Sequence, residues 1–65
     1  EVDRGVAQVL IEEAVAAGGA SRIIRRARRA LARGNRSADE GRYERAAVHY
    51  GRAWSAASQA LRRAE

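Results

Sequence analysis

The chain has 65 residues, among them 16 alanines and 13 arginines, and its formal net charge is +5. The lack of cysteine excludes disulfide bonds and thiolate metal sites, and the lack of about 18 consecutive apolar residues excludes a membrane-spanning helix. Because so short a chain buries only about 60% of the surface that it exposes when unfolded, we expect one domain with a thin core and no cleft. The abundance of alanine and arginine, both good helix formers, and the absence of proline predict that this domain is all-α.

The first helix is predicted over residues 4–17. Asp3 is a good N-cap, and Gly18-Gly19 is a typical helix end. Glu12 and Glu13 form an acidic back that can pair with arginines of this chain or of a symmetric partner. The apolar and small residues share the opposite, broad side: Val6, Ala7, Leu10, Ile11, Ala14, Val15 and Ala17.

The second helix is predicted over residues 22–40, with Ser21 as its N-cap. At about 100° per residue, one arc carries Ile23, Ile24, Ala27, Ala30, Leu31, Gly34 and Ala38. The opposite arc carries the arginines that are candidates for binding a partner: Arg22, Arg25, Arg26, Arg29, Arg33 and Arg36.

The end of this helix has two interpretations. Gly34-Asn35 is a stop signal, and Ser37 and Glu40 have the spacing of a capping box, which together would end the helix at Arg33. Continuing the helix instead keeps Asp39 outside the apolar arc. The phase of the pattern therefore favours a turn at Gly41-Arg42.

The third helix is predicted over residues 43–63, and all three aromatic residues lie on its apolar stripe. Short connections between the three helices favour an antiparallel three-helix bundle that runs up, down and up. We expect its core to be held together by Leu10, Ile24, Leu31, Tyr43, Tyr50, Trp54 and Leu61.

The stretch "GNRSADEGRYERAAVHYGRAW" resembles a tetratricopeptide-type repeat over about residues 27–54. In that family a small residue of the first helix lets two helices touch, and Gly34 matches it. Five further positions match the family's turn and second helix in spacing: Gly41, Tyr43, Ala46, Tyr50 and Ala53. The resemblance implies that the second and third helices form a long hairpin.

The chain departs from the family at Ala30, Arg33 and Ser37, where a large aromatic residue, a leucine and a tyrosine are preferred, and no proline closes the repeat. Such repeats normally stack in threes or more, and the chain holds one. We therefore expect no concave peptide-binding groove of the kind that stacked repeats form.

The whole pattern, with "LARGN" and "GRYERAAVHYGRAW", also resembles helical accessory segments of large multidomain secreted or surface proteins from GC-rich bacteria. This second resemblance implies a spacer or accessory role and an extracellular location. Since the chain begins Glu1-Val2 without methionine, we expect it to be part of a larger protein.

The arginine-rich arc of the second helix has three interpretations. It is a solvated helix back, a surface that contacts a protein or another acidic surface, or a strip that binds nucleic acid through salt-dependent phosphate contacts. The third interpretation lacks aromatic residues among the arginines and a helix-turn-helix arrangement.

For function, the sequence predicts a non-catalytic helical accessory or protein-interaction module that contacts another domain or subunit. The alternatives are a nucleic-acid-binding module and a homo-oligomer that meets through apolar stripes including Val9 and Val48. We expect no catalytic residue, metal or cofactor site, because the single histidine, His49, has no carboxylate three or four residues after it.

Overall fold

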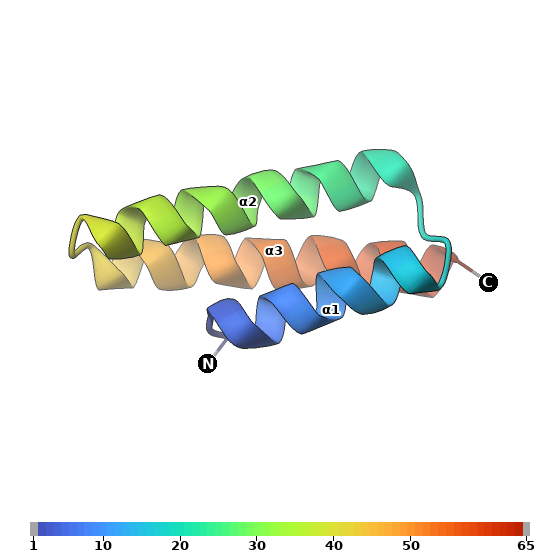
Figure 1. Ribbon diagram of the computed structural model, residues 1–65, viewed down its shortest axis with the longest axis horizontal. Helices are drawn as coiled ribbons and strands as arrows, with labels where there is room; N and C mark the ends of the chain where they lie inside the picture. The colour runs from blue at the N-terminus through green and yellow to red at the C-terminus, as the bar shows by residue number, and fades with distance from the viewer. Residues whose placement is uncertain (1, 65) are drawn as a thin grey trace.

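The computed structural model describes residues 2–64, most of which lie in three α-helices. These are α1 (Arg4–Ala16), α2 (Ser21–Asp39) and α3 (Tyr43–Arg63). They run up, down and up, and α2 and α3 form a long antiparallel hairpin with the most extensive contact in the molecule (Figure 1). The predicted all-α three-helix bundle is therefore confirmed. Glu1 and Glu65, the ends of the predicted 1–65 domain, lie outside the described residues.

Local hydrogen bonds define both ends of α1, as the sequence predicts. The backbone N–H of Val6 donates to Oδ1 of Asp3 at 3.0 Å, which makes Asp3 the N-cap. At the other end, Gly18 has a φ of 78°, a left-handed conformation that glycine adopts without a steric penalty. The N–H of Gly19 donates to the carbonyl of Ala14 at 2.9 Å, and the chain turns towards α2.

The start of α2 differs from the prediction that Ser21 caps it. Ala20 is the N-cap, and no side chain accepts a hydrogen bond at this end. The carbonyl of Ala20 instead accepts hydrogen bonds from the N–H groups of Ile23 and Ile24, at 3.1 and 3.0 Å. The short connection requires extended backbone at Ala20 to make the corner, so the helix begins one residue earlier than predicted.

The turn between α2 and α3 lies at Gly41-Arg42, because α2 continues through Gly34 to Asp39. Gly41 has a φ of 77°, and the N–H of Arg42 donates to the carbonyl of Ser37 at 2.8 Å. The phase of the apolar positions thus predicted this boundary correctly. The stop signal at Gly34 does not end the helix, since continuation keeps Ser37 buried and Asp39 exposed to water.

Gly34 lies in the middle of α2, where the ring of Tyr50 packs against it. A Cβ atom built on Gly34 would lie only 2.6 Å from Cδ1 of Tyr50, so no side chain fits. Tyr50 is 8% exposed, and its hydroxyl donates to Oδ1 of Asn35 at 2.9 Å. A glycine that weakens an isolated helix therefore allows this hairpin to close.

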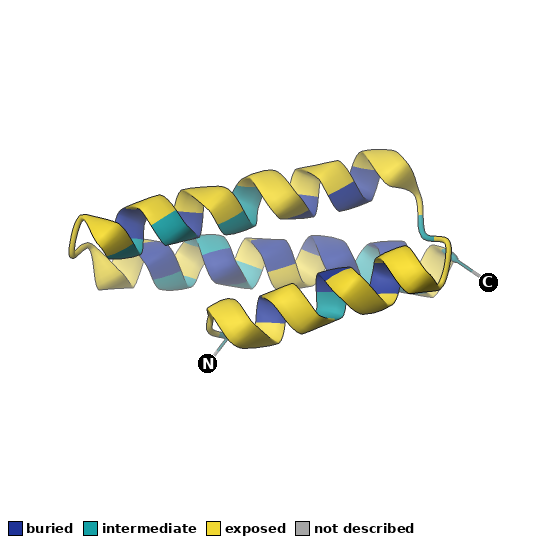
Figure 2. Cartoon of the chain, viewed as in Figure 1, coloured by how far each residue is buried: buried dark blue, intermediate teal, exposed yellow. Residues whose placement is uncertain are grey.

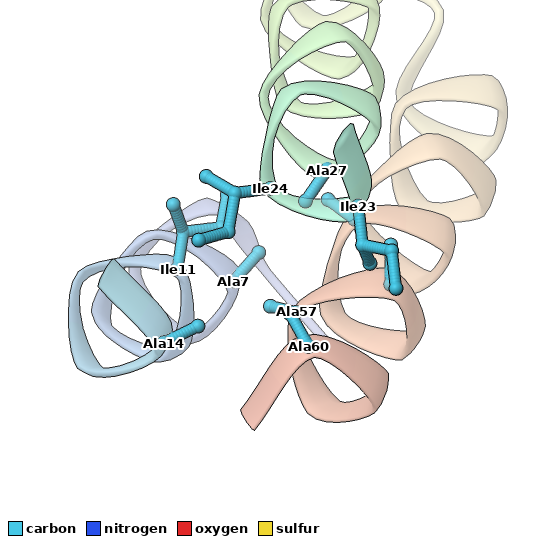
Figure 3. Close-up of a cluster of buried hydrophobic side chains, with 10 residues drawn as sticks. Ala7, Ile11, Ala14, Ile23, Ile24, Ala27, Ala57 and Ala60 are labelled. Carbon is cyan, nitrogen blue, oxygen red and sulfur yellow. The ribbon is translucent and has the colours of Figure 1, made fainter. Parts of the chain in front are cut away.

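Alanine forms the centre of the bundle, because six alanines are fully buried: Ala7, Ala14, Ala27, Ala53, Ala57 and Ala60. Three isoleucines between 4% and 7% exposed surround them: Ile11, Ile23 and Ile24. Figure 3 shows Ile24 of α2 pointing towards Ile11 of α1. Small side chains let helix axes approach to about 8 Å, which suits a bundle only 14 Å across in its thinnest direction.

The predicted core is correct for Ile24 and Tyr50 and wrong for Tyr43 and Trp54, which are 71% and 39% exposed. Trp54 lies about 100° round α3 from the fully buried Ala53, past the edge of the buried stripe. Tyr43 lies in the first turn of α3, at the end of the hairpin that α1 does not cover (Figure 2). The three remaining predicted residues are half-buried at the edge of the core: Leu10, Leu31 and Leu61.

Candidate functional site

The arginines of α2 make it the most strongly charged element of the molecule. All six predicted partner-binding candidates are exposed: Arg22, Arg25, Arg26, Arg29, Arg33 and Arg36. Arg28 is exposed as well, whereas Asp39 is the only acidic residue of the helix. The guanidinium groups therefore face water, as the sequence predicts.

A groove of about 770 Å³ between α2 and α3 gathers some of these arginines. Ala30 and Ala56, at the edges of the buried stripes, form its floor, and its rim carries Arg26, Arg29, Arg33 and Arg52. Gly51 also lines the groove, about 140° round α3 from Ala56 and so on its outer side. We call this surface the basic groove. The groove is broadly open to solvent, because Ala30 and Ala56 leave the seam between the two helices shallowly filled, and the expectation of no enclosed cleft stays a prediction.

The basic groove lies on the side of the hairpin that α1 leaves free, and no residue of α1 lines it. At about 100° per residue, Arg26 and Ala30 fall on one edge of the buried stripe of α2 and Ile24 on the other. Ile24 points towards Ile11 of α1 (Figure 3). The groove, on the other edge of the stripe, therefore lies on the opposite side of the two helices from α1.

The positive charge of the basic groove is not neutralised within the described part of the chain. No carboxylate lines the groove, and the one ion pair among residues 2–64 joins Arg42 and Glu40 at 3.9 Å, on the exposed turn. Glu12 and Glu13, the predicted partners of the arginines, are exposed on α1 and pair with none of them. They cannot reach the groove because α1 packs on the other side of the hairpin.

Sequence reasoning missed Arg52, the groove arginine that α3 contributes. The signal was present, since Arg45, His49 and Arg52 follow one another at spacings of four and three residues and so share one face of α3. His49 and Arg52 both line the groove. What the sequence did not show is that this face of α3 lies beside Arg26, Arg29 and Arg33 of α2.

His49 is partly exposed and lies on the wall of the groove. Within residues 2–64, no three histidine, aspartate or glutamate side chains gather closely enough to hold a metal ion. Guanidinium groups remain protonated and act only as hydrogen-bond donors. The groove therefore offers positive charge and donors, a chemistry suited to binding carboxylates or phosphates.

A second surface lies in a shallow hollow between α1 and α3, lined by Val6, Val9 and Trp54. Val6 is 46% exposed, because α1 packs on the hairpin through one narrow row of side chains rather than the broad side predicted. Val9 and Val48, the valines named for the oligomer alternative, are both exposed. They lie on different surfaces, since Val48 lines the basic groove.

Comparisons with known protein families, with curated proteins and with solved structures find nothing that matches the chain. The tetratricopeptide resemblance therefore stays a prediction, and the chain is described as a three-helix all-α domain. None of the helices within residues 2–64 is long and apolar enough to cross a membrane.

Proposed function

We propose that the chain is a non-catalytic helical module of a larger protein and that it binds another protein through the basic groove. The observation that supports this is a concave surface with a floor of small residues and a rim of four arginines that form no ion pair with any carboxylate of residues 2–64. A polypeptide offers both the apolar side chains to cover such a floor and the acidic side chains to pair with such a rim.

The close packing of Tyr50 on Gly34 supports the same proposal. The tetratricopeptide resemblance implies a contact of this kind, because a small residue of the first helix there lets the second helix pack closely against it. Helical hairpins of this kind commonly serve as interaction scaffolds in proteins built from repeats. An accessory role beside another domain agrees with the second resemblance.

Nucleic-acid binding is the second candidate, and the exposed arginines of α2 favour it. Single-stranded nucleic acids are usually held by stacking on aromatic side chains, and the basic groove is lined by no phenylalanine, tyrosine or tryptophan and by one imidazole, that of His49. Homo-oligomer formation would use the hollow at Val6, Val9 and Trp54 instead, and sedimentation at several concentrations tests it.

Site-specific photo-cross-linking tests the proposed function. A benzophenone amino acid at Ser55, an exposed residue of the groove, should yield a discrete protein adduct in the cells that make the protein. The same probe at Arg25, outside the groove on the back of α2, is the control and should not yield that adduct. Adducts with nucleic acid alone, or no adduct at Ser55, would contradict the proposal.

A further inference from the structure

Gly51 lies in the middle of α3 and lines the outer side of the basic groove, and nothing in the described chain requires a glycine there. A Cβ atom built on Gly51 would meet no atom within 4 Å, and its φ is not positive. An interior glycine destabilises a helix relative to alanine. The residue leaves open space at the surface where a partner's backbone can come close.

The shape of the groove suits a helix. Its lining residues on α3 run from Val48 to Gln59, a length of about 16 Å or three helical turns. The small side chains of Ala30 and Ala56 permit the interaxial distances of about 8–10 Å at which helices pack, and Gly51 leaves room at the outer side of the groove. A helix in this position would lie on α2 and α3 as α1 does on their other side.

The positive charges of the groove favour a helix that carries acidic side chains. Arg26, Arg29 and Arg33 follow one another at spacings of three and four residues, so their guanidinium groups lie along one edge. Arg52 faces them from α3. Acidic residues at spacings of four and three on an incoming helix can meet this edge, with small apolar residues turned to the floor.

We infer that the basic groove binds an acidic amphipathic helix of a partner protein, about three turns long. This inference rests on the proposed function, because it presupposes that the partner is a protein. A nucleic acid is the weaker fit, since its phosphates can pair with the arginines but its backbone has no apolar side chains to cover the floor.

The test uses the full chain and a labelled synthetic helical peptide of about 14 residues, with three glutamates on one edge beside an alanine and leucine face. At low ionic strength we expect saturable binding with a dissociation constant below about 100 µM by fluorescence anisotropy. Amide chemical-shift changes should map to Ala30, Gly51 and Ala56. A peptide of the same composition with its glutamates spread round the helix is the control and should bind at least about tenfold more weakly.

Two matched double variants separate the groove from the general charge of α2. Arg29→Gln with Arg33→Gln should weaken binding about tenfold, whereas Arg25→Gln with Arg28→Gln, which removes the same charge outside the groove, should change it less than about threefold. Gly51→Leu should weaken binding by a similar factor without lowering the melting temperature, because open space surrounds its Cβ position and leucine favours a helix over glycine.

Equal binding of both peptides, equal effects of both double variants, or tighter binding of a duplex RNA of similar charge would each overturn the inference. These three outcomes can be distinguished from a failure of the proposed function by the Ser55 cross-link. If the Ser55 cross-link identifies a protein whose contact segment is not an acidic helix, the interaction module stands and its partner chemistry is wrong. If Ser55 captures no protein, the proposed function itself fails.

Discussion

Two glycines inside helices have opposite surroundings. At Gly34 the ring of Tyr50 occupies the space that a side chain would need. At Gly51 that space is open, and the glycine lines the basic groove. The same residue type therefore permits contact within the chain at one position and leaves room for contact with a partner at the other.

This contrast predicts stability changes of opposite sign. Gly34→Ala should lower the free energy of unfolding by about 1–3 kcal/mol, because the new methyl group displaces the Tyr50 ring. Gly51→Ala should raise it by about 0.5–1 kcal/mol, because alanine favours the helix and meets no neighbour. Urea denaturation followed by circular dichroism measures both. Stabilisation by Gly34→Ala would contradict the packing of Tyr50 on α2.

At the scale of the elements, α1 and α2 begin in different ways. A side chain caps α1, where Asp3 accepts the N–H of Val6, whereas α2 starts from Ala20 without a side-chain cap. Both serine and aspartate are favourable N-cap residues, so the sequence alone does not distinguish Asp3 from Ser21. The turn after Gly19 determines which of the two residues is a cap, because it places Ser21 inside the helix.

Alanine substitutions at the two positions should separate these roles. Asp3→Ala should lower the free energy of unfolding by about 1 kcal/mol, because the N–H of Val6 loses its partner. Ser21→Ala should change it by less than about 0.5 kcal/mol, since the side chain does not cap α2. Thermal and urea melts of the two variants provide the measurement. A larger effect of Ser21→Ala would show that the serine caps α2 after all.

At the scale of the whole molecule, a thin alanine core supports a chain whose formal net charge is +5. The seven arginines of α2 repeat at spacings of three and four residues with no acidic neighbour before Asp39. Like charges at these spacings repel one another, by about 0.2–0.5 kcal/mol for each pair. The ion pair between Arg42 and Glu40 is exposed and does little to offset this.

Added salt should therefore stabilise the fold. Raising sodium chloride from about 20 mM to 500 mM screens the repulsion and should raise the melting temperature by several degrees, about 4–8 °C for each kcal/mol gained. Arg25→Glu with Arg28→Glu, on the back of α2, should reduce this salt dependence. A melting temperature that falls with salt in the unchanged chain would show that attractive ion pairs dominate instead.

The sequence by itself determined the three helices and the exposed position of the arginines. Helix formation depends on local properties, namely 3.6-residue periodicity, the cap at Asp3 and the turns at Gly18 and Gly41, and each of these can be read along the chain. The same periodicity was enough to place the turn at Gly41-Arg42 and to turn the guanidinium groups away from the core.

Only the tertiary structure decided which apolar residues form the core and where a groove remains. Each helix buries a narrow stripe, and α1 covers only part of the hairpin, so Tyr43 and Trp54 stay exposed while alanines fill the centre. The basic groove arises because Arg52 of α3 comes to lie beside three arginines of α2. Such pairings depend on how each helix is rotated about its own axis. That rotation is determined by packing contacts between residues that are distant in sequence.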